Sequence, residues 1–264
     1  MAEWLLYVIA LESSSLNFQV LLNDVPVKRL LDGSSLTSQT NVNPWIVEGT
    51  NALEIGLGLP AGDGQEARAD KSRSFQLRLF GGEYGRVPEP EEALIEFIWN
   101  SAAQPLGETM TTVFTKEFLP EISFGRWRWQ DSPAAPLTES DKQELVQLIR
   151  EVHRVFKEKD VGGLTELMKL VSEEMARAMD IEEEELVMGQ RGIFSNLFAS
   201  DGWRIDPLEE SALVFNQLAG GRLVEVTRAG GQPFLTGTTG ESQYASNFMF
   251  GRVAGAWQIL RPGS

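Results

Sequence analysis

Apolar and polar positions follow two different periods along this chain. Up to about residue 130, short apolar segments alternate with polar residues and are separated by Gly, Pro, Asn and Asp. A period of two is typical of strands buried on one face. The segments predicted as strands are 17–22, 25–27, 36–47, 52–59, 74–80, 93–99, 111–119 and 126–130. Because no helical pattern separates them, they indicate an all-β antiparallel sandwich.

Beyond residue 137 the apolar positions recur with the helical period. Thr138 and Asp141 form a capping-box pattern, which predicts that a helix begins there. The predicted helices cover 138–159, 164–179 and 182–198, with Gly162-Gly163 as the first break and Asp180 as the cap of the third helix. These helices precede a second group of strands, so we expect an α+β fold here.

The second group of strands is punctuated by glycine turns. The predicted strands are 213–218, 222–228, 233–238, 244–250 and 256–260, joined at 219–221, 229–231 and 253–255. Glycine supplies the positive φ angles that tight turns require. We therefore expect two domains: a β-sandwich over 1–130 and an α+β domain over 138–264. Residues 131–137, with Pro133 and Pro136, are the predicted linker.

Composition and charge narrow the possible functions. The 264 residues are 42% hydrophobic and 23% charged, which is typical of a globular protein, and the net charge is −15. Such an acidic chain repels phosphate groups, so we expect neither nucleic-acid nor membrane binding. The chain has no cysteine and one histidine, His153, so thiolate and histidine-rich metal sites are excluded.

No targeting segment is evident in the sequence. The longest early apolar run, 4–10, is too short for a membrane span and lacks the basic flank of a signal peptide. We expect a soluble, cytoplasmic protein without metal or cofactor.

The second half resembles the nuclear transport factor 2-like (SnoaL/cystatin-like) superfamily. The resemblance rests on the capped first helix, the two further helices, and the closing hairpin Asn247–Leu260 with its Trp257-x-Ile259 strand. It implies helices packed on a curved antiparallel sheet, an α+β cone. Members of that superfamily include small-ligand isomerases, dehydratases and cyclases as well as non-catalytic interaction modules, so the fold does not select a function.

The first half is loosely similar to the galactose-binding-like jelly-roll sandwiches. The similar segments are Val20–Val27 and Asn43–Ile55, in which Gly49 and Asn51 are expected to make a tight turn before a buried strand. Many such sandwiches bind sugars and many are only structural. No sugar-binding residue is carried over.

Four short motifs have structural explanations that we prefer. Gly56–Ala61 has the letters of a dinucleotide loop but no following helix. Arg126–Trp129 is expected to be a strand with both tryptophans buried. Glu182–Glu185 fits the solvated first turn of a helix better than a calcium site. His153 lies at the edge of an apolar stripe, and nothing places Asp201 or Asp206 beside it, so no catalytic residue is assigned.

The resemblance to the cone fold implies an enclosed pocket. The side chains expected to line it are Trp203, Phe215, Glu225, Tyr244 and Phe248. This assignment depends on a strand parity that the sequence does not determine.

The sequence favours a non-enzymatic bacterial binding or interaction protein of adaptor or immunity type. The partner is expected to be a more basic protein that the acidic surface attracts. One alternative is an enzyme or sensor that uses the cone pocket for a small hydrophobic ligand, with an Asp, Glu or Tyr as acid–base group. Another is carbohydrate binding by the sandwich, and a homodimer is also compatible with the sheet edges.

Overall fold

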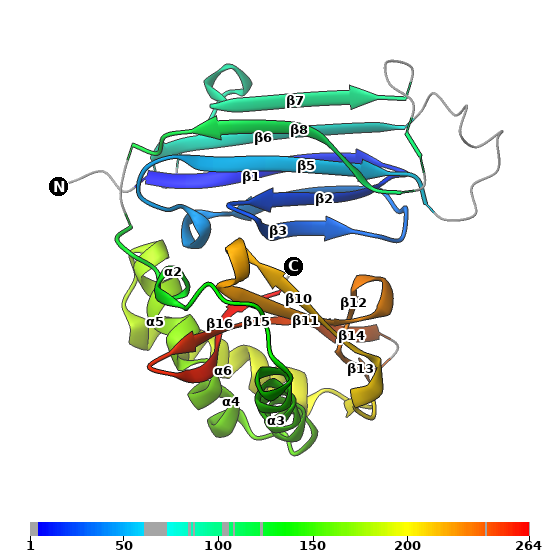
Figure 1. Cartoon of the computed structure of the whole chain (residues 1–264), viewed down its shortest axis with the longest axis vertical. Helices are drawn as coiled ribbons and strands as arrows, with labels where there is room; N and C mark the ends of the chain where they lie inside the picture. The colour runs from blue at the N-terminus through cyan, green and yellow to red at the C-terminus, as the bar shows by residue number, and fades with distance from the viewer. Residues whose placement is uncertain are drawn as a thin grey trace. The chain divides into compact units, whose positions relative to one another are not determined.

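The computed structural model describes residues 5–60, 73–83, 86, 88–101, 106–107, 109–121, 124–240 and 242–263. The fold is mostly antiparallel β-sheet, with helices in the second half (Figure 1). The chain divides into two compact units, one within residues 1–126 and the other Trp127–Gly263. The boundary between them lies just before the predicted linker.

The first unit contains two four-stranded antiparallel sheets, in the orders β4-β1-β6-β7 and β3-β2-β5-β8. The strands are β1 (Leu5–Ser14), β2 (Asn17–Leu22), β3 (Val25–Leu30), β4 (Leu36–Asn41), β5 (Asn51–Gly58), β6 (Ser74–Glu83), β7 (Ile95–Asn100) and β8 (Thr111–Phe118). The rings of Phe18 on β2 and Phe75 on β6 meet 5.3 Å apart between the two sheets. Two antiparallel sheets in contact are consistent with the predicted β-sandwich; the finer jelly-roll assignment stays a prediction.

The central strand β1 is not indicated by alternation in the sequence. Its inward residues Tyr7, Ile9 and Leu11 are fully buried, but the outward residues Val8 and Ala10 are apolar as well. Because both faces carry apolar side chains, the period of two disappears over this segment.

An asparagine network forms the turn that leads into β5. Gly49 has a φ of +84°, a conformation that glycine adopts without strain. The Asn51 side chain accepts a hydrogen bond from the Val47 amide at 2.9 Å and donates to the Gly49 carbonyl at 3.0 Å. Asn23 donates to the same Asn51 oxygen at 2.8 Å, which joins this turn to the β2–β3 hairpin. The tight turn predicted at Gly49 and Asn51 is confirmed.

The second unit begins with helices, as the pattern predicts. They are α2 (Arg128–Asp131), α3 (Glu139–Lys157), α4 (Val161–Leu167), α5 (Lys169–Met179) and α6 (Glu183–Ala199). The predicted cap is confirmed, since Thr138 accepts a hydrogen bond from the Asp141 amide at 3.2 Å and its own amide donates to the Asp141 carboxylate at 2.8 Å. Figure 1 shows α3, α4 and α6 on one side of the strands that follow.

The helix predicted at 164–179 is divided into α4 and α5 at Met168, and two predicted helix signals have other roles. Gly162-Gly163 does not break a helix but lies in the first turn of α4, where Asp160 caps the Gly163 amide at 2.8 Å. A Cβ on Gly163 would crowd the capping carboxylate of Asp160. Asp180 does not cap α6 either, because its left-handed conformation (φ +52°) ends α5.

Two antiparallel sheets complete the second unit, β10-β11-β15-β16 and β14-β13-β9, with β12 paired to β11. The strands are β9 (Arg204–Ile205), β10 (Leu213–Leu218), β11 (Leu223–Arg228), β12 (Gln232–Pro233), β13 (Leu235–Thr239), β14 (Ser242–Ser246), β15 (Phe248–Val253) and β16 (Ala256–Pro262). The three glycine turns are confirmed by positive φ angles at Gly220, Gly230 and Gly255. That the sheet forms a cone stays a prediction.

The strand predicted at 126–130 is wrong. Residues Arg128–Asp131 form the short helix α2, in which the Gln130 side chain accepts a hydrogen bond from the Trp127 amide at 2.8 Å. Both Trp127 and Trp129 are nevertheless buried, as expected. Trp127 precedes α2 as its N-cap, so the two buried tryptophans do not share one face of a regular element, and a segment this short is too brief for its period to be read.

The Pro-containing segment 131–137 is bonded to the sheet of the second unit. The Arg222 guanidinium donates to the Ser132 carbonyl at 2.9 Å, and the Ser132 hydroxyl accepts from the Arg252 amide at 2.9 Å. Gln217 donates to the Ala135 carbonyl at 2.7 Å. The segment is therefore part of this unit.

A buried ion pair joins helix α5 to the last strand. Arg261 is fully buried and bonds the carboxylate of Glu174, which is itself 3% exposed. The other oxygen of Glu174 accepts a hydrogen bond from the Arg128 amide at 2.6 Å. Burial lowers the pKa of Arg261, while the Glu174 carboxylate opposes that shift.

We expect Glu174→Gln to lower the free energy of unfolding by about 3–5 kcal/mol, because it leaves the buried Arg261 cation without its counter-charge. Urea denaturation measures this. The matched control is Glu173→Gln. Because Glu173 pairs with the exposed Arg128, we expect this variant to lose less than about 1 kcal/mol of unfolding free energy. Equal losses in the two variants would contradict the prediction.

The lowered pKa of Asp141 should make the stability of the protein depend on pH. Hydrogen bonds from the Thr138 hydroxyl, from Arg252 and from the Thr138 amide lower the pKa of Asp141 from 3.8 to about 2. A lowered pKa in the folded state stabilises the protein above pH 4, and this stabilisation is lost as the pH falls towards 2. Asp141→Asn should therefore cost about 1 kcal/mol at pH 7. The difference in Tm from the parent should shrink between pH 4 and pH 2.5; a constant difference would refute this explanation.

Candidate functional site

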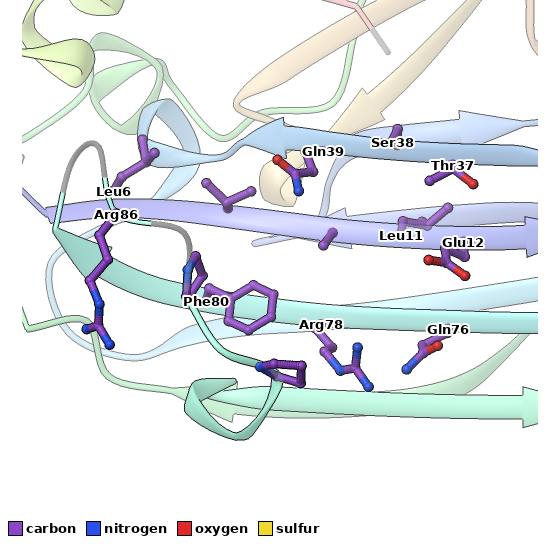
Figure 2. A pocket seen from close by; sticks show the side chains of 14 residues that line it. Leu6, Leu11, Glu12, Thr37, Ser38, Gln39, Gln76, Arg78, Phe80 and Arg86 are labelled. Carbon is purple, nitrogen blue, oxygen red and sulfur yellow. The ribbon is translucent and has the colours of Figure 1, made fainter.

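A hollow of about 340 Å³ lies on the outer face of the sheet β4-β1-β6-β7. Its volume is at the lower end of the usual range for ligand pockets. The residues that line it are Leu6, Val8, Ala10, Leu11, Glu12, Thr37, Ser38, Gln39, Gln76, Arg78, Phe80, Arg86, Pro88 and Pro90. Figure 2 shows that Leu6, Phe80 and Arg86 gather at one end and that Glu12, Thr37 and Gln76 gather at the other.

The hollow exists because a small residue stands at the centre of the sheet. Ala10 on β1 lies directly between Gln39 on β4 and Arg78 on β6. Cross-strand neighbours on one face are about 5 Å apart, so the two long side chains form walls on either side of a methyl group. The floor of the hollow is therefore formed by Ala10, and its walls by the outward side chains of β4 and β6 beside it.

One end of the hollow is mostly apolar, with the ion-paired Arg86 beside it. Val8 pairs with Phe80 across β1 and β6, and Leu6 lies two residues further along the same face. Phe80 is only 8% exposed although it points away from the sandwich core. Pro88 and Pro90 also line the hollow.

The other end is polar. Glu12 lies between Thr37 on β4 and Gln76 on β6. Within the described residues, the side chains of Glu12, Gln39 and Gln76 have no hydrogen-bond or ion-pair partner. Their polar groups are therefore available to a ligand.

The two cations of the hollow already have partners. Arg78 pairs with Glu96 at 2.7 Å, and Arg86 pairs with Glu92. The Glu89 amide and Arg86 together lower the pKa of Glu92, which keeps this carboxylate charged. With both arginines neutralised, the uncompensated charge of the described lining is the Glu12 carboxylate.

The residues predicted to line a cone pocket lie in the second unit. Trp203 and Phe248 are buried members of its hydrophobic core, and Phe215 and Tyr244 pack against that core. Glu225 lies apart from these four, because it points to the opposite face of β11 from Val224 and Val226. Four of the five residues are therefore brought together, and their role as ligand contacts stays a prediction.

Aromatic rings occupy the space that these four side chains face. The Trp203 and Tyr244 rings are 5.2 Å apart, and Phe156 on α3 lies 5.8 Å from Tyr244 and 6.5 Å from Phe248. The Trp203 indole also donates to the Phe156 carbonyl at 3.4 Å. Edge-to-face and tilted contacts at these distances are those of a packed interior.

Tyr244, one candidate acid–base group, has a pKa far from neutral, and His153 does not contact a carboxylate among the described residues. Burial raises the pKa of Tyr244 to about 12, against a smaller opposing hydrogen bond with Ser246. A general acid or base works best with a pKa near the operating pH. His153 bonds the backbone carbonyl of Asp206 at 2.8 Å, whereas the Asp206 carboxylate accepts from Thr236 at 2.7 Å. The imidazole and the carboxylate therefore do not form a pair.

The other motifs have structural roles where the structure describes them. Gly56 and Gly58 lie within β5, and Ala61 at the end of that motif lies outside the described residues. Glu183, Glu184 and Glu185 occupy the exposed first turn of α6, as predicted. The part of the chain that the structure describes contains no group of three potential metal ligands. Among the described helices, none is long and apolar enough to cross a membrane.

Sequence reasoning did not identify the hollow. Its floor belongs to β1, which shows no alternation, and its walls come from β4 and β6, which are far apart in the sequence. The available signal was the single Ala10 among larger apolar residues, followed by Glu12 on the same face. That signal has a meaning only once the strand and its register are known.

No family model, curated protein or solved structure matches this chain. The two family resemblances of the sequence therefore stay predictions. Any proposal of a function therefore rests on the chemistry of the site itself.

We expect Phe248→Ala to lower the free energy of unfolding by about 3–5 kcal/mol, because it removes a buried ring from a packed cluster. Thermal or urea unfolding measures the loss. The cavity created should admit a small aromatic molecule, so saturating benzene should raise the Tm of the variant and leave that of the parent unchanged. Stabilisation of the parent by benzene would instead indicate an open pocket.

Proposed function

We propose that this chain is a non-enzymatic binding protein of adaptor or immunity type, and that the hollow around Ala10 contacts its protein partner. The observation that carries the proposal is the combination of an apolar floor with the unpartnered polar groups of Glu12, Gln39 and Gln76 in the described part of the chain. Apolar surface supplies affinity, and a few oriented polar groups supply specificity. A net charge of −15 accelerates association with a basic protein.

The exposed apolar side chains favour a protein partner over a sugar. Sugar recognition on a sheet usually requires an aromatic ring that is exposed for stacking. The large apolar side chains that are exposed in the described residues are all aliphatic: Leu94, Ile98, Leu119, Ile181, Met188, Ile193 and Val214. Ile98 lies on the same face as the hollow, beside Gln76, and is 60% exposed.

The packed interior of the second unit favours binding over catalysis. The enzyme alternative requires an accessible cavity with an acid–base group tuned towards neutral pH. The ring contacts around Phe156 and the raised pKa of Tyr244 give that alternative no support.

The test is capture of the partner by the tagged full-length chain, identified by mass spectrometry, with two matched variants. Ala10→Arg places a long cation on the floor of the hollow. Ala52→Arg makes the same change at an outward position of β5, in the other sheet. We expect a stoichiometric partner that is lost with Ala10→Arg, kept with Ala52→Arg, and weakened as salt rises.

Unfolding curves control for stability, because both positions point outward and should tolerate the arginine within about 1 kcal/mol. Retention of the partner by a folded Ala10→Arg variant would overturn the proposed surface. Capture of no partner by the parent chain would overturn the proposed function.

A further inference from the structure

We propose that the hollow binds an extended, basic segment of the partner protein, with a lysine or arginine at Glu12 and an aliphatic side chain over Val8 and Phe80. This inference rests on the proposed function and specifies the chemistry of the partner. It follows from three properties of the hollow: its charge, its length and the placement of its free amides.

The charge of the lining selects a cation. Glu96 and Glu92 already pair with Arg78 and Arg86, which reduces the attraction of these two cations for an anionic ligand. Glu12 has no such partner in the described residues and is exposed to solvent. A bound ammonium or guanidinium group would complete a charge-assisted hydrogen bond there.

The length of the hollow defines a spacing. Glu12 and Val8 lie on the same face of β1, four residues apart, which corresponds to about 13–14 Å along a strand. In an extended segment, alternate side chains face the same surface. A segment that lies along β1 therefore presents its cation at one position and its aliphatic side chain four positions away.

Two free amides are placed to bind the backbone of such a segment. Gln39 flanks β1 beside Ala10 on one side, and Gln76 flanks it beside Glu12 on the other. Each amide has both donors and an acceptor, so it can bond either a backbone carbonyl or an amide N–H. An extended segment needs such partners because the backbone of β1 is already engaged with β4 and β6. The small Ala10 leaves room for that backbone to approach the sheet.

The test is isothermal titration calorimetry of the full-length chain with three seven-residue peptides, capped at both ends. The first peptide is Gly-Lys-Thr-Ser-Thr-Leu-Gly. The second has Glu in place of Lys, and the third has Leu moved next to Lys. We expect the first peptide to bind at least about fivefold more tightly than either of the others.

Protein variants separate local recognition from general attraction by an acidic surface. Glu12→Gln should weaken the first peptide about five- to tenfold. Glu54→Gln is the matched control, because it removes the same charge from an outward position on β5 that has no partner among the described residues, and it should change the affinity less than about twofold. Equal effects of the two variants, equal affinity for the three peptides, or no binding of the first peptide would each overturn the inference.

Failure of this inference is distinguishable from failure of the proposed function. If Ala10→Arg abolishes partner capture while Glu12→Gln leaves it intact, the surface is correct and the basic segment is not. If the peptides follow the expected order but Ala10→Arg still captures the partner, the hollow binds basic segments and the proposed function at this surface is wrong.

Discussion

The second unit depends on one buried carboxylate. Glu174 of α5 bonds Arg261 of β16 near the end of the unit and the amide of Arg128 at its beginning. Trp127, which is fully buried, has the Arg177 and Arg261 guanidinium groups at 4.3 and 5.2 Å from its ring centres. The start of α2, helix α5 and strand β16 therefore meet at Glu174. Helix α5 and strand β16 also contribute Val171 and Ile259 to the hydrophobic cluster that contains Phe156.

Such a carboxylate is costly to bury, and its bonds compensate that cost. A buried charge is tolerated when its hydrogen-bonding capacity is met by partners of good geometry. In the first unit, neutral polar groups are satisfied in the same way, since the side chains of Asn23 and Asn51 form hydrogen bonds with each other and with the surrounding backbone. Glu12, Gln39 and Gln76 differ from these groups, because they line a hollow and have no partner among the described residues.

The elements of the fold were largely predictable because their signals are local. The cap at Thr138, the glycine turns and strands such as Asn17–Leu22 each depend on a few neighbouring residues, and the structure confirms them. Strand β1 was missed because both of its faces are apolar, and α2 was predicted as a strand because a segment this short is too brief for its period to be read. The hollow requires the register of three strands from distant parts of the chain, which no local pattern specifies.

That register is fixed from the inner face of the sheet. The amide of Tyr7 donates to the Asn43 side chain at 2.7 Å, its carbonyl accepts from the Val42 amide at 2.9 Å, and its hydroxyl accepts from the Glu121 amide at 2.7 Å. A slip of β1 by one residue would break these bonds and turn Ile9 and Leu11 outward, while Ala10 and Glu12 would point into the core. The proposed recognition surface and the core are therefore formed by alternate residues of one strand. The bonds that hold Tyr7 thus also place Glu12 at the polar end of the hollow.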